Sequence, residues 1–217
     1  MSNSVAKVCL LGLLLAGTSF AQDAERSYTV DSSQSELHWL VYKAGALARL
    51  GHNHTIAVGD LRGTVRAKPA DLAGSSFDLE FTVANLVVDD AALRKTLGAD
   101  FESVPSANDI EGTRGNMLGE RVLDGEKHPK IRIVGNGPIM RDGTQALTVK
   151  VELLGRTVDL TVPTKITIDD QQVQATGEFE LNHADLGMKP FSVMAGALQV
   201  GEKLSFSYRV TARRDAR

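Results

Sequence analysis

The chain has 217 residues, a formal net charge of −3 and a single cysteine, Cys9. This length is sufficient to bury a sizeable core within one domain. The near-neutral charge and the lack of a basic block exclude a typical nucleic-acid-binding protein. With one cysteine, the chain can form no internal disulfide and no cluster of thiolate metal ligands.

The first segment of the sequence is typical of an export signal. Lys7 precedes an apolar run over residues 8–16, and small residues follow it. A basic start, a short apolar run and a small-x-small site define a signal peptide, whereas a membrane span needs about 20 apolar residues. We therefore expect a signal peptide over residues 1–21 and a mature periplasmic chain that starts at Gln22. We expect this mature chain to form one domain, residues 22–217, without a transmembrane segment.

Apolar and polar side chains alternate along much of the mature chain. Residues 77–83 are apolar at every odd position, and residues 147–153 repeat this pattern. Strict alternation predicts β-strands that have one apolar face. Gly155-Arg156 predicts a hairpin turn, and Asp169-Asp170 is interpreted as another turn. Further strands are expected at residues 28–30, 36–42, 55–67, 131–133, 158–168 (continuous through Pro163), 173–181 and 204–210.

One stretch interrupts the strands and predicts helix. Residues 89–98 combine an acidic start, helix-forming residues and a final glycine, so Asp89-Asp90 is interpreted as a helix N-terminus. Ser106 and Asp109 resemble a capping box for a second helix, although three glycines weaken that helix. Strands on both sides of a helical insert predict an all-β antiparallel barrel of about eight strands, with a helix across one mouth. A barrel of this size holds either a packed core or one ligand, and the pattern alone leaves both open.

Five segments in order resemble the YceI-like family of exported lipid-binding proteins. They are Val30–Ser35, Gly59–Gly63, Val122–Ile133, Leu153–Val158, and Leu181–Gly187 with Val200–Leu204. The resemblance implies a lipocalin-like antiparallel β-barrel that holds a polyisoprenoid or similar amphiphile, with no catalytic residues and no cofactor. The sequence departs from the family pattern at Gln34, at His183 and over residues 50–56, which bears on the identity of the lipid.

The segment Leu50-Gly51-His52-Asn53-His54 contains the most unusual local pattern. On a strand, residues two apart share a face, so His52 and His54 could approach one metal ion together. A third ligand would then come from His38, His183 or Asp185. The alternative is that these imidazoles form local hydrogen bonds or contact the head group of a ligand. We assign no metal site to this pair on sequence grounds.

The expected lipid contacts combine the alternating apolar positions with histidines and an apolar loop. Residues 187–198 form that loop, and its Met and Phe side chains suit the mouth of a lipid pocket. Trp39 is interpreted chiefly as a plug of the barrel. The candidate lipid-binding residues are Trp39, His52, His54, Phe77, Leu79, Phe81, Val83, Leu147, Val149, Val151, Leu153, His183, Met188, Phe191 and Met194.

The sequence therefore predicts a periplasmic carrier that binds a polyisoprenoid or another long-chain amphiphile and is not an enzyme. Neither a Gly-x-Ser-x-Gly elbow nor a His-Glu-x-x-His helix is present in the sequence. Two alternatives remain, a metal-assisted enzyme that uses His52 and His54, and a filled barrel that only binds a partner. A homodimer is a further candidate assembly.

Overall fold

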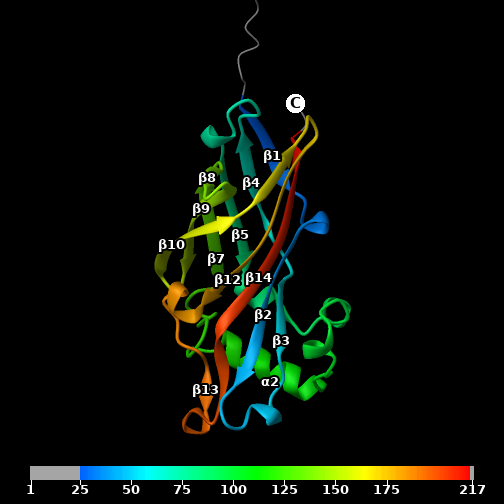
Figure 1. The fold of residues 1–217 in the computed structure, drawn as a ribbon, viewed down its shortest axis with the longest axis vertical. Helices are drawn as coiled ribbons and strands as arrows, with labels where there is room; N and C mark the ends of the chain where they lie inside the picture. Colours follow the sequence, from blue (N-terminus) through cyan, green and yellow to red (C-terminus); the bar gives the residue numbers. More distant parts are fainter. Residues whose placement is uncertain (1–24, 216–217) are drawn as a thin grey trace, which may run out of the picture.

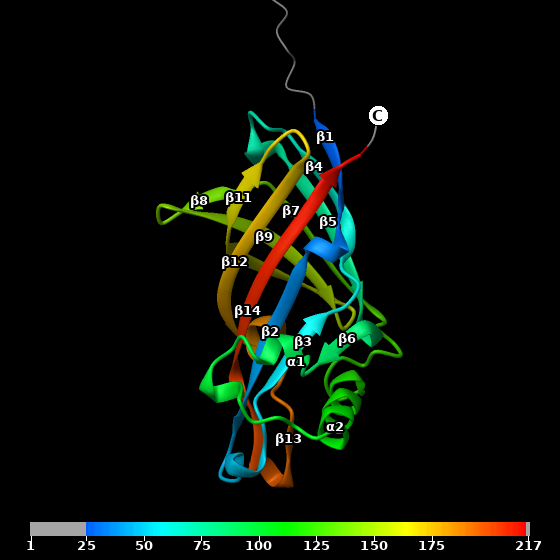
Figure 2. The same ribbon diagram turned by 90° about the vertical axis from the view of Figure 1, so that its right-hand side faces the viewer.

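The computed structural model describes residues 25–215. Its main feature is a strongly curved β-sheet, one face of which lies on the inside of the curve (Figures 1 and 2). The signal-peptide prediction falls on residues 1–21, outside the described residues. The strands are β1 (Arg26–Val30), β2 (Glu36–Ala44), β3 (His54–Val58), β4 (Arg62–Ala67), β5 (Ser76–Thr82), β6 (Leu86–Val88), β7 (Lys130–Asn136), β8 (Ile139–Arg141), β9 (Thr144–Leu153), β10 (Arg156–Pro163), β11 (Lys165–Ile168), β12 (Gln172–Asn182), β13 (Ser192–Val193) and β14 (Leu198–Arg214).

Two α-helices and several short 3-10 turns connect these strands. The α-helices are α1 (Ala91–Arg94) and α2 (Ala107–Leu118). The 3-10 turns are η1 (Ser32–Gln34), η2 (Ala48–Leu50), η3 (Leu72–Gly74), η4 (Val83–Asn85), η5 (Ala99–Phe101), η6 (His183–Leu186) and η7 (Met194–Gly196).

Within residues 25–215, all 14 strands belong to one antiparallel sheet, and the long strand β14 pairs with strands on both of its edges. One edge of β14 pairs with β1 and β2, and its other edge pairs with β12. The main path of the sheet runs β10-β9-β7-β5-β4-β1-β14-β2-β3-β6. The two ends of the described chain meet where Tyr28 pairs with Arg214, at the end of the molecule opposite α2 (Figure 1).

The prediction of a closed barrel of about eight strands is wrong, because the sheet has 14 strands and no ladder joins β10 to β12. Pro163 ends β10 and has no amide hydrogen to donate to a ladder. After it, the Thr164 amide donates to the Gln145 carbonyl, and the chain turns to pair with β12 instead of β9. The predicted single strand over residues 158–168 is therefore two strands, β10 and β11, with different partners.

The predicted hairpin between β9 and β10 is confirmed, and its turn lies one residue earlier than expected. Leu153 pairs with Arg156, which leaves Leu154 and Gly155 as a two-residue turn. Both turn residues have positive φ, 52° and 69°. Two-residue hairpin turns of this kind need such values and favour glycine, because its missing Cβ removes the steric cost.

The helical insert is also confirmed, with a shorter first helix than predicted. Helix α1 has four residues, whereas α2 has twelve and begins with the predicted capping box between Ser106 and Asp109. The apolar side chains of α2 and the turn that follows it pack on the core of the sheet. Helix α2 thus lies at one end of the curled sheet (Figure 2).

Candidate functional site

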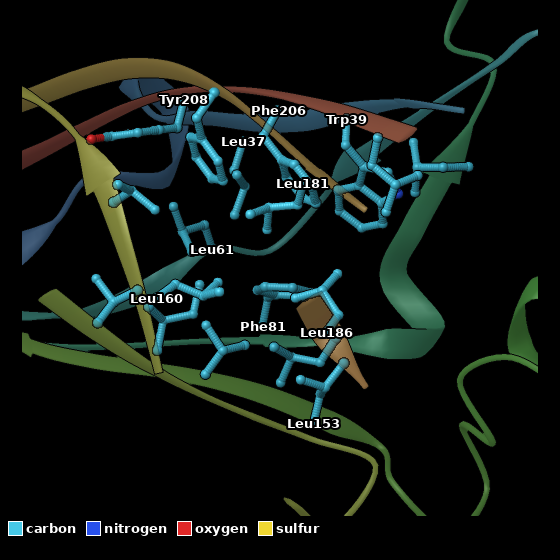
Figure 3. A pocket seen from close by; sticks show the side chains of 18 of the residues that line it. Leu37, Trp39, Leu61, Phe81, Leu153, Leu160, Leu181, Leu186, Phe206 and Tyr208 are labelled. Atoms are coloured by element: carbon cyan, nitrogen blue, oxygen red, sulfur yellow. The ribbon is translucent and has the colours of Figure 1, made fainter. Parts of the chain in front are cut away.

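The inner face of the sheet encloses an apolar cavity of about 490 Å³. Inward side chains from β2, β4, β5, β7, β9, β10, β12 and β14 line it, together with residues of α2 and of the segment between β12 and β14. Figure 3 shows lining side chains around the central space and labels some of them, among them Leu61, Leu160 and Leu186. The interior is therefore a cavity and not a fully packed core. Its volume falls in the range of small-molecule pockets, roughly 300–1,000 Å³.

Four aromatic rings form one wall of the cavity across β2, β14 and β12. Phe206 pairs in register with Trp39 on one side and with Phe179 on the other. Its ring stacks on both, with centroid distances of 5.8 Å to Trp39 and 5.1 Å to Phe179. Tyr208 completes the row, and burial raises the pKa of its hydroxyl. Trp39 is thus a wall residue of the cavity, and not a plug across it (Figure 3).

Most of the predicted contact residues line the cavity. The residues that do so are Trp39, His52, His54, Phe77, Leu79, Phe81, Leu147, Val149, Val151, Leu153, His183, Met188 and Phe191. Two others lie elsewhere. Val83 starts the turn η4, where the alternation ends, and its side chain is buried in the core outside the cavity wall. Met194 is 67% exposed on the outer surface of η7.

Several residues of the cavity wall were not predicted as lipid contacts from the sequence. Leu37, Leu61, Leu160, Leu181, Phe179, Phe206 and Tyr208 all line the cavity. For β10, β12 and β14 the alternation already marked one apolar face, and that signal was sufficient to find them. Leu61 gave no such signal, because it lies in the turn before β4.

His54 and His52 lie at the cavity end that α2 covers, and each has a local partner. Val41 of β2 lines the cavity and pairs with His54, so the imidazole of His54 faces inward too. His54 Nδ1 is 2.7 Å from Asp89 Oδ2, and His52 Nδ1 is 3.0 Å from Ser103 Oγ. The two rings meet edge to face at 6.2 Å between centroids.

The expected third metal ligands do not join these histidines. His38 lies on the opposite face of β2 from the cavity-lining Leu37 and Trp39, so it is not placed to act as the third ligand. His183 Nδ1 bonds the Glu202 carbonyl, and the Asp185 carboxylate caps the turn η6. Within residues 25–215, no three His, Cys, Asp or Glu side chains are arranged to hold a metal ion.

A buried ion pair between Asp89 and Arg94, not predicted from the sequence, holds the His54 ring through its Nδ1 atom. Asp89 was interpreted as part of a helix N-terminus, but it is Asp90 that caps α1. The fully buried Asp89 carboxylate accepts hydrogen bonds from His54, from the Thr55 amide at 3.0 Å and from Arg94 at 2.6 Å. Burial by itself would raise the pKa of Asp89, but the bonds from His54 and Thr55 and the charge of Arg94 outweigh it and lower this pKa.

Arg94 fixes the surrounding backbone through further donors on Nη1 and Nη2, whereas its buried Nε has no hydrogen-bond partner among the described residues. Its Nη1 also donates to the Asn53 carbonyl at 2.8 Å, and its Nη2 donates to the carbonyls of Phe101 and Ser103. The guanidinium thus ties β3 to the segment after α1. No sequence signal predicted this arrangement, since Asp89 lies 35 residues from His54 in the chain.

These features define a mostly β protein whose curled sheet encloses an apolar cavity. The family model of the YceI-like domain matches residues 28–212, and the chain therefore belongs to the YceI-like family. This is a family of lipid-binding proteins that are typically periplasmic and generally not enzymes, which supports interpreting the chain as a binding protein. No curated protein matches the chain.

Solved structures share this fold at low sequence identity. The crystal structure of BcnA from Burkholderia cenocepacia has a TM-score of 0.61 and 14% identity, over 84% of this chain and 99% of BcnA. The YCEI protein of Campylobacter jejuni has a TM-score of 0.51 and 10% identity, over 74% of this chain and 85% of that protein. No helix within residues 25–215 is long and apolar enough to cross a membrane.

Proposed function

We propose that this protein is an exported carrier that holds a polyisoprenoid or a similar long-chain amphiphile in the cavity of its sheet. The observation that carries the proposal is the cavity of about 490 Å³, whose wall consists mainly of Leu, Val, Ile and Phe side chains. Each methylene group that leaves water for such an interior contributes about 0.8 kcal/mol, so a long chain binds through its buried area. Binding, and not catalysis, is the proposed activity.

In this proposal the apolar wall of the cavity and the polar groups at its α2 end contact different parts of the ligand. The aromatic rings of Trp39, Phe206 and Phe179 contact the apolar chain of the ligand. Met188 and Phe191 contact the same chain from the segment between β12 and β14. Few polar groups line the cavity, and such groups fix the orientation of a ligand in sites of this kind. The histidines at the α2 end are the best placed of these groups.

Mass spectrometry of bound lipid tests the proposal. The full-length chain is expressed with its own N-terminus, and the protein from the periplasmic fraction is extracted with organic solvent. We expect an N-terminus at Gln22 and about one long-chain amphiphile for each protein chain. Protein that carries no lipid and takes up none from added lipid extracts would refute the carrier and would favour a partner-binding module.

A further inference from the structure

The cavity end under α2 carries a hydrogen-bonding pair that faces the interior. His54 on β3 and Thr113 on α2 both line the cavity, and Thr113 Oγ1 is 3.4 Å from His54 Nε2. This contact is long for a hydrogen bond between a hydroxyl and a ring nitrogen. His54 Nε2 can therefore form a hydrogen bond with a ligand atom at the cavity end under α2.

The hydrogen bond between His54 and Asp89 determines which ring nitrogen of His54 carries the proton. Asp89 is a carboxylate that accepts from His54 Nδ1 at 2.7 Å, so the proton of the neutral ring sits on Nδ1. Arg94 already compensates the charge of Asp89 through a bond of 2.6 Å. The Nε2 atom consequently presents a lone pair to the cavity, and this atom accepts a hydrogen bond from a ligand.

The charges around this end disfavour an anionic ligand group. Arg94 does not line the cavity: its Nη1 and Nη2 donate to Asp89 and to backbone carbonyls, and its Nε is buried without a hydrogen-bond partner among the described residues. The Asp109 carboxylate lies 3.8 Å from His52 Nε2, and hydrogen bonds from Ser106 hold its pKa below the ordinary value. Lys43 also lines the cavity, but its exposed ammonium donates to the Gly51 carbonyl.

We propose that His54 Nε2, assisted by the Thr113 hydroxyl, binds the hydroxyl head group of a long-chain alcohol, and that the site prefers this alcohol to its phosphate ester. The inference rests on the proposed carrier function and specifies the chemical class of its ligand. In this arrangement the alcohol donates its proton to Nε2, and its oxygen can accept from Thr113. An ether of the same chain keeps the apolar contacts but has no proton to donate.

Three matched probes test this assignment in the intact protein after removal of bound lipid. They are geranylgeraniol, its methyl ether and its monophosphate. Trp39 is the only tryptophan and lines the cavity, so its fluorescence reports the binding of each probe. We expect the alcohol to bind about tenfold more tightly than the ether, the scale of one hydrogen bond, and more tightly than the phosphate.

Variants of His54 and Thr113 then show which side chains cause the difference in affinity between the alcohol and the ether. His54→Ala should bind alcohol and ether equally, and Thr113→Val should reduce their difference. His38→Ala is the matched control, because His38 lies on the outer face of the neighbouring strand β2. If His54→Ala does not fold, the ring ¹⁵N resonances of wild-type protein give the same test. The alcohol should then shift the Nε2 resonance of His54 and leave that of His38 unchanged.

The outcomes separate this inference from the carrier proposal. Equal affinity of wild-type protein for alcohol and ether, or tightest binding of the phosphate, overturns the head-group assignment while the carrier proposal stands. If none of the three probes binds, both proposals fail.

A separate observation concerns the outer surface at the end of the molecule opposite the termini. The segment from Gly187 to Leu198 starts beside Arg156 of β10, and its part around β13 lies next to the segment from Lys43 to Gly51 there in both views (Figures 1 and 2). The Leu47 amide donates to the Ala197 carbonyl. Both segments contribute to the cavity wall. We call this pair of segments the tip.

The tip exposes apolar side chains and has one sign of charge. Leu50 is 61% exposed and Met194 is 67% exposed. The tip contains the basic residues Lys43, Arg49 and Lys189 and no acidic residue. Met194 and Ala195 both have positive φ, 50° and 54°, a conformation that is strained for non-glycine residues. The fold thus maintains a strained turn that presents Met194 to the outside.

We propose that the tip docks on the surface of an anionic lipid bilayer. Exposed apolar side chains insert at the boundary of the head groups, and each nearby Lys or Arg adds electrostatic attraction to an anionic surface. Because the tip segments also line the cavity, docking places one end of the cavity at the bilayer. This inference depends on the surface and not on the identity of a bound lipid.

Vesicle flotation tests the docking. Wild-type protein should float with vesicles of equal parts phosphatidylcholine and phosphatidylglycerol, less at high salt, and not with pure phosphatidylcholine. Leu50→Ser/Met194→Ser and Arg49→Glu/Lys189→Glu should each remove most of this binding. Ile139→Ser/Met140→Ser is the control, since these large apolar side chains are also exposed, at 46% and 68%, on the distant β8 hairpin. Unchanged flotation of the tip variants, no flotation of the wild type, or burial of the tip in a dimer in solution would overturn the proposal.

Discussion

Removal of the Asp89 carboxylate should destabilise the fold more than removal of any neighbouring acid. The Asp89 side chain is 0% exposed, and its carboxylate accepts hydrogen bonds from three donors. The donors are Arg94 at 2.6 Å, His54 at 2.7 Å and the Thr55 amide at 3.0 Å. Arg94, only 6% exposed, would keep its charge and lose its partner in Asp89→Ala. An uncompensated buried charge of this kind costs about 3–5 kcal/mol.

Thermal unfolding followed by circular dichroism measures this loss. In a domain of this size, 1 kcal/mol shifts Tm by about 2–4 °C, so Asp89→Ala should lower Tm by roughly 10 °C. Asp90→Ala is the matched control, because Asp90 is exposed and caps α1 through two amides. A lost N-cap costs about 1 kcal/mol. The reasoning is refuted if Asp89→Ala is no more destabilising than Asp90→Ala.

A double variant separates the charge from the packing. Asp89→Ala/Arg94→Met removes both members of the ion pair, so no unpaired guanidinium remains in the interior. Replacement of a whole buried pair by apolar side chains is often close to neutral. We therefore expect the double variant to be more stable than Asp89→Ala alone, and a larger loss in the double variant would contradict this account.

The remaining predictions concern pH, the cavity wall and a close backbone approach. The pKa of Asp89 is lowered in the folded state. The contribution of its carboxylate to the free energy of unfolding is therefore complete above the unfolded pKa of about 3.9 and is lost as the pH falls below that value. The difference in unfolding free energy between wild type and Asp89→Ala, measured by urea titration, should shrink below about pH 4. Val151→Glu puts a charge on a half-buried wall position and should give folded protein with little lipid by mass spectrometry, whereas the outward Thr148→Glu should keep its lipid. Gly177→Ala should cost about 1–3 kcal/mol in chemical denaturation, because its Cβ would lie 2.3 Å from the Pro163 carbonyl oxygen; wild-type stability in this variant would show that the approach is not tight.

Local patterns in the sequence were sufficient for much of the secondary structure. Alternation located β5, β9, β12 and β14, since the inward and outward faces of a strand differ within a few residues. The capping box of Ser106 and Asp109 was equally local, because its two bonds join residues three apart. The same patterns identified most residues of the cavity wall, including Phe81 and Val151.

Properties that depend on distant contacts required the tertiary structure. Alternation assigns a face to each strand but does not say whether β10 pairs with β12, and the break after Pro163 leaves the sheet open. It also does not say whether apolar faces fill the interior or enclose a cavity, because that depends on the curvature of the whole sheet. Asp89 appeared to be a helix cap from its neighbours, yet its partners His54 and Arg94 come from different elements. The pairing of β6 with β3 places Asp89 beside His54, and Arg94 of α1 reaches the same carboxylate, so tertiary contacts decide how the polar end of the cavity is built.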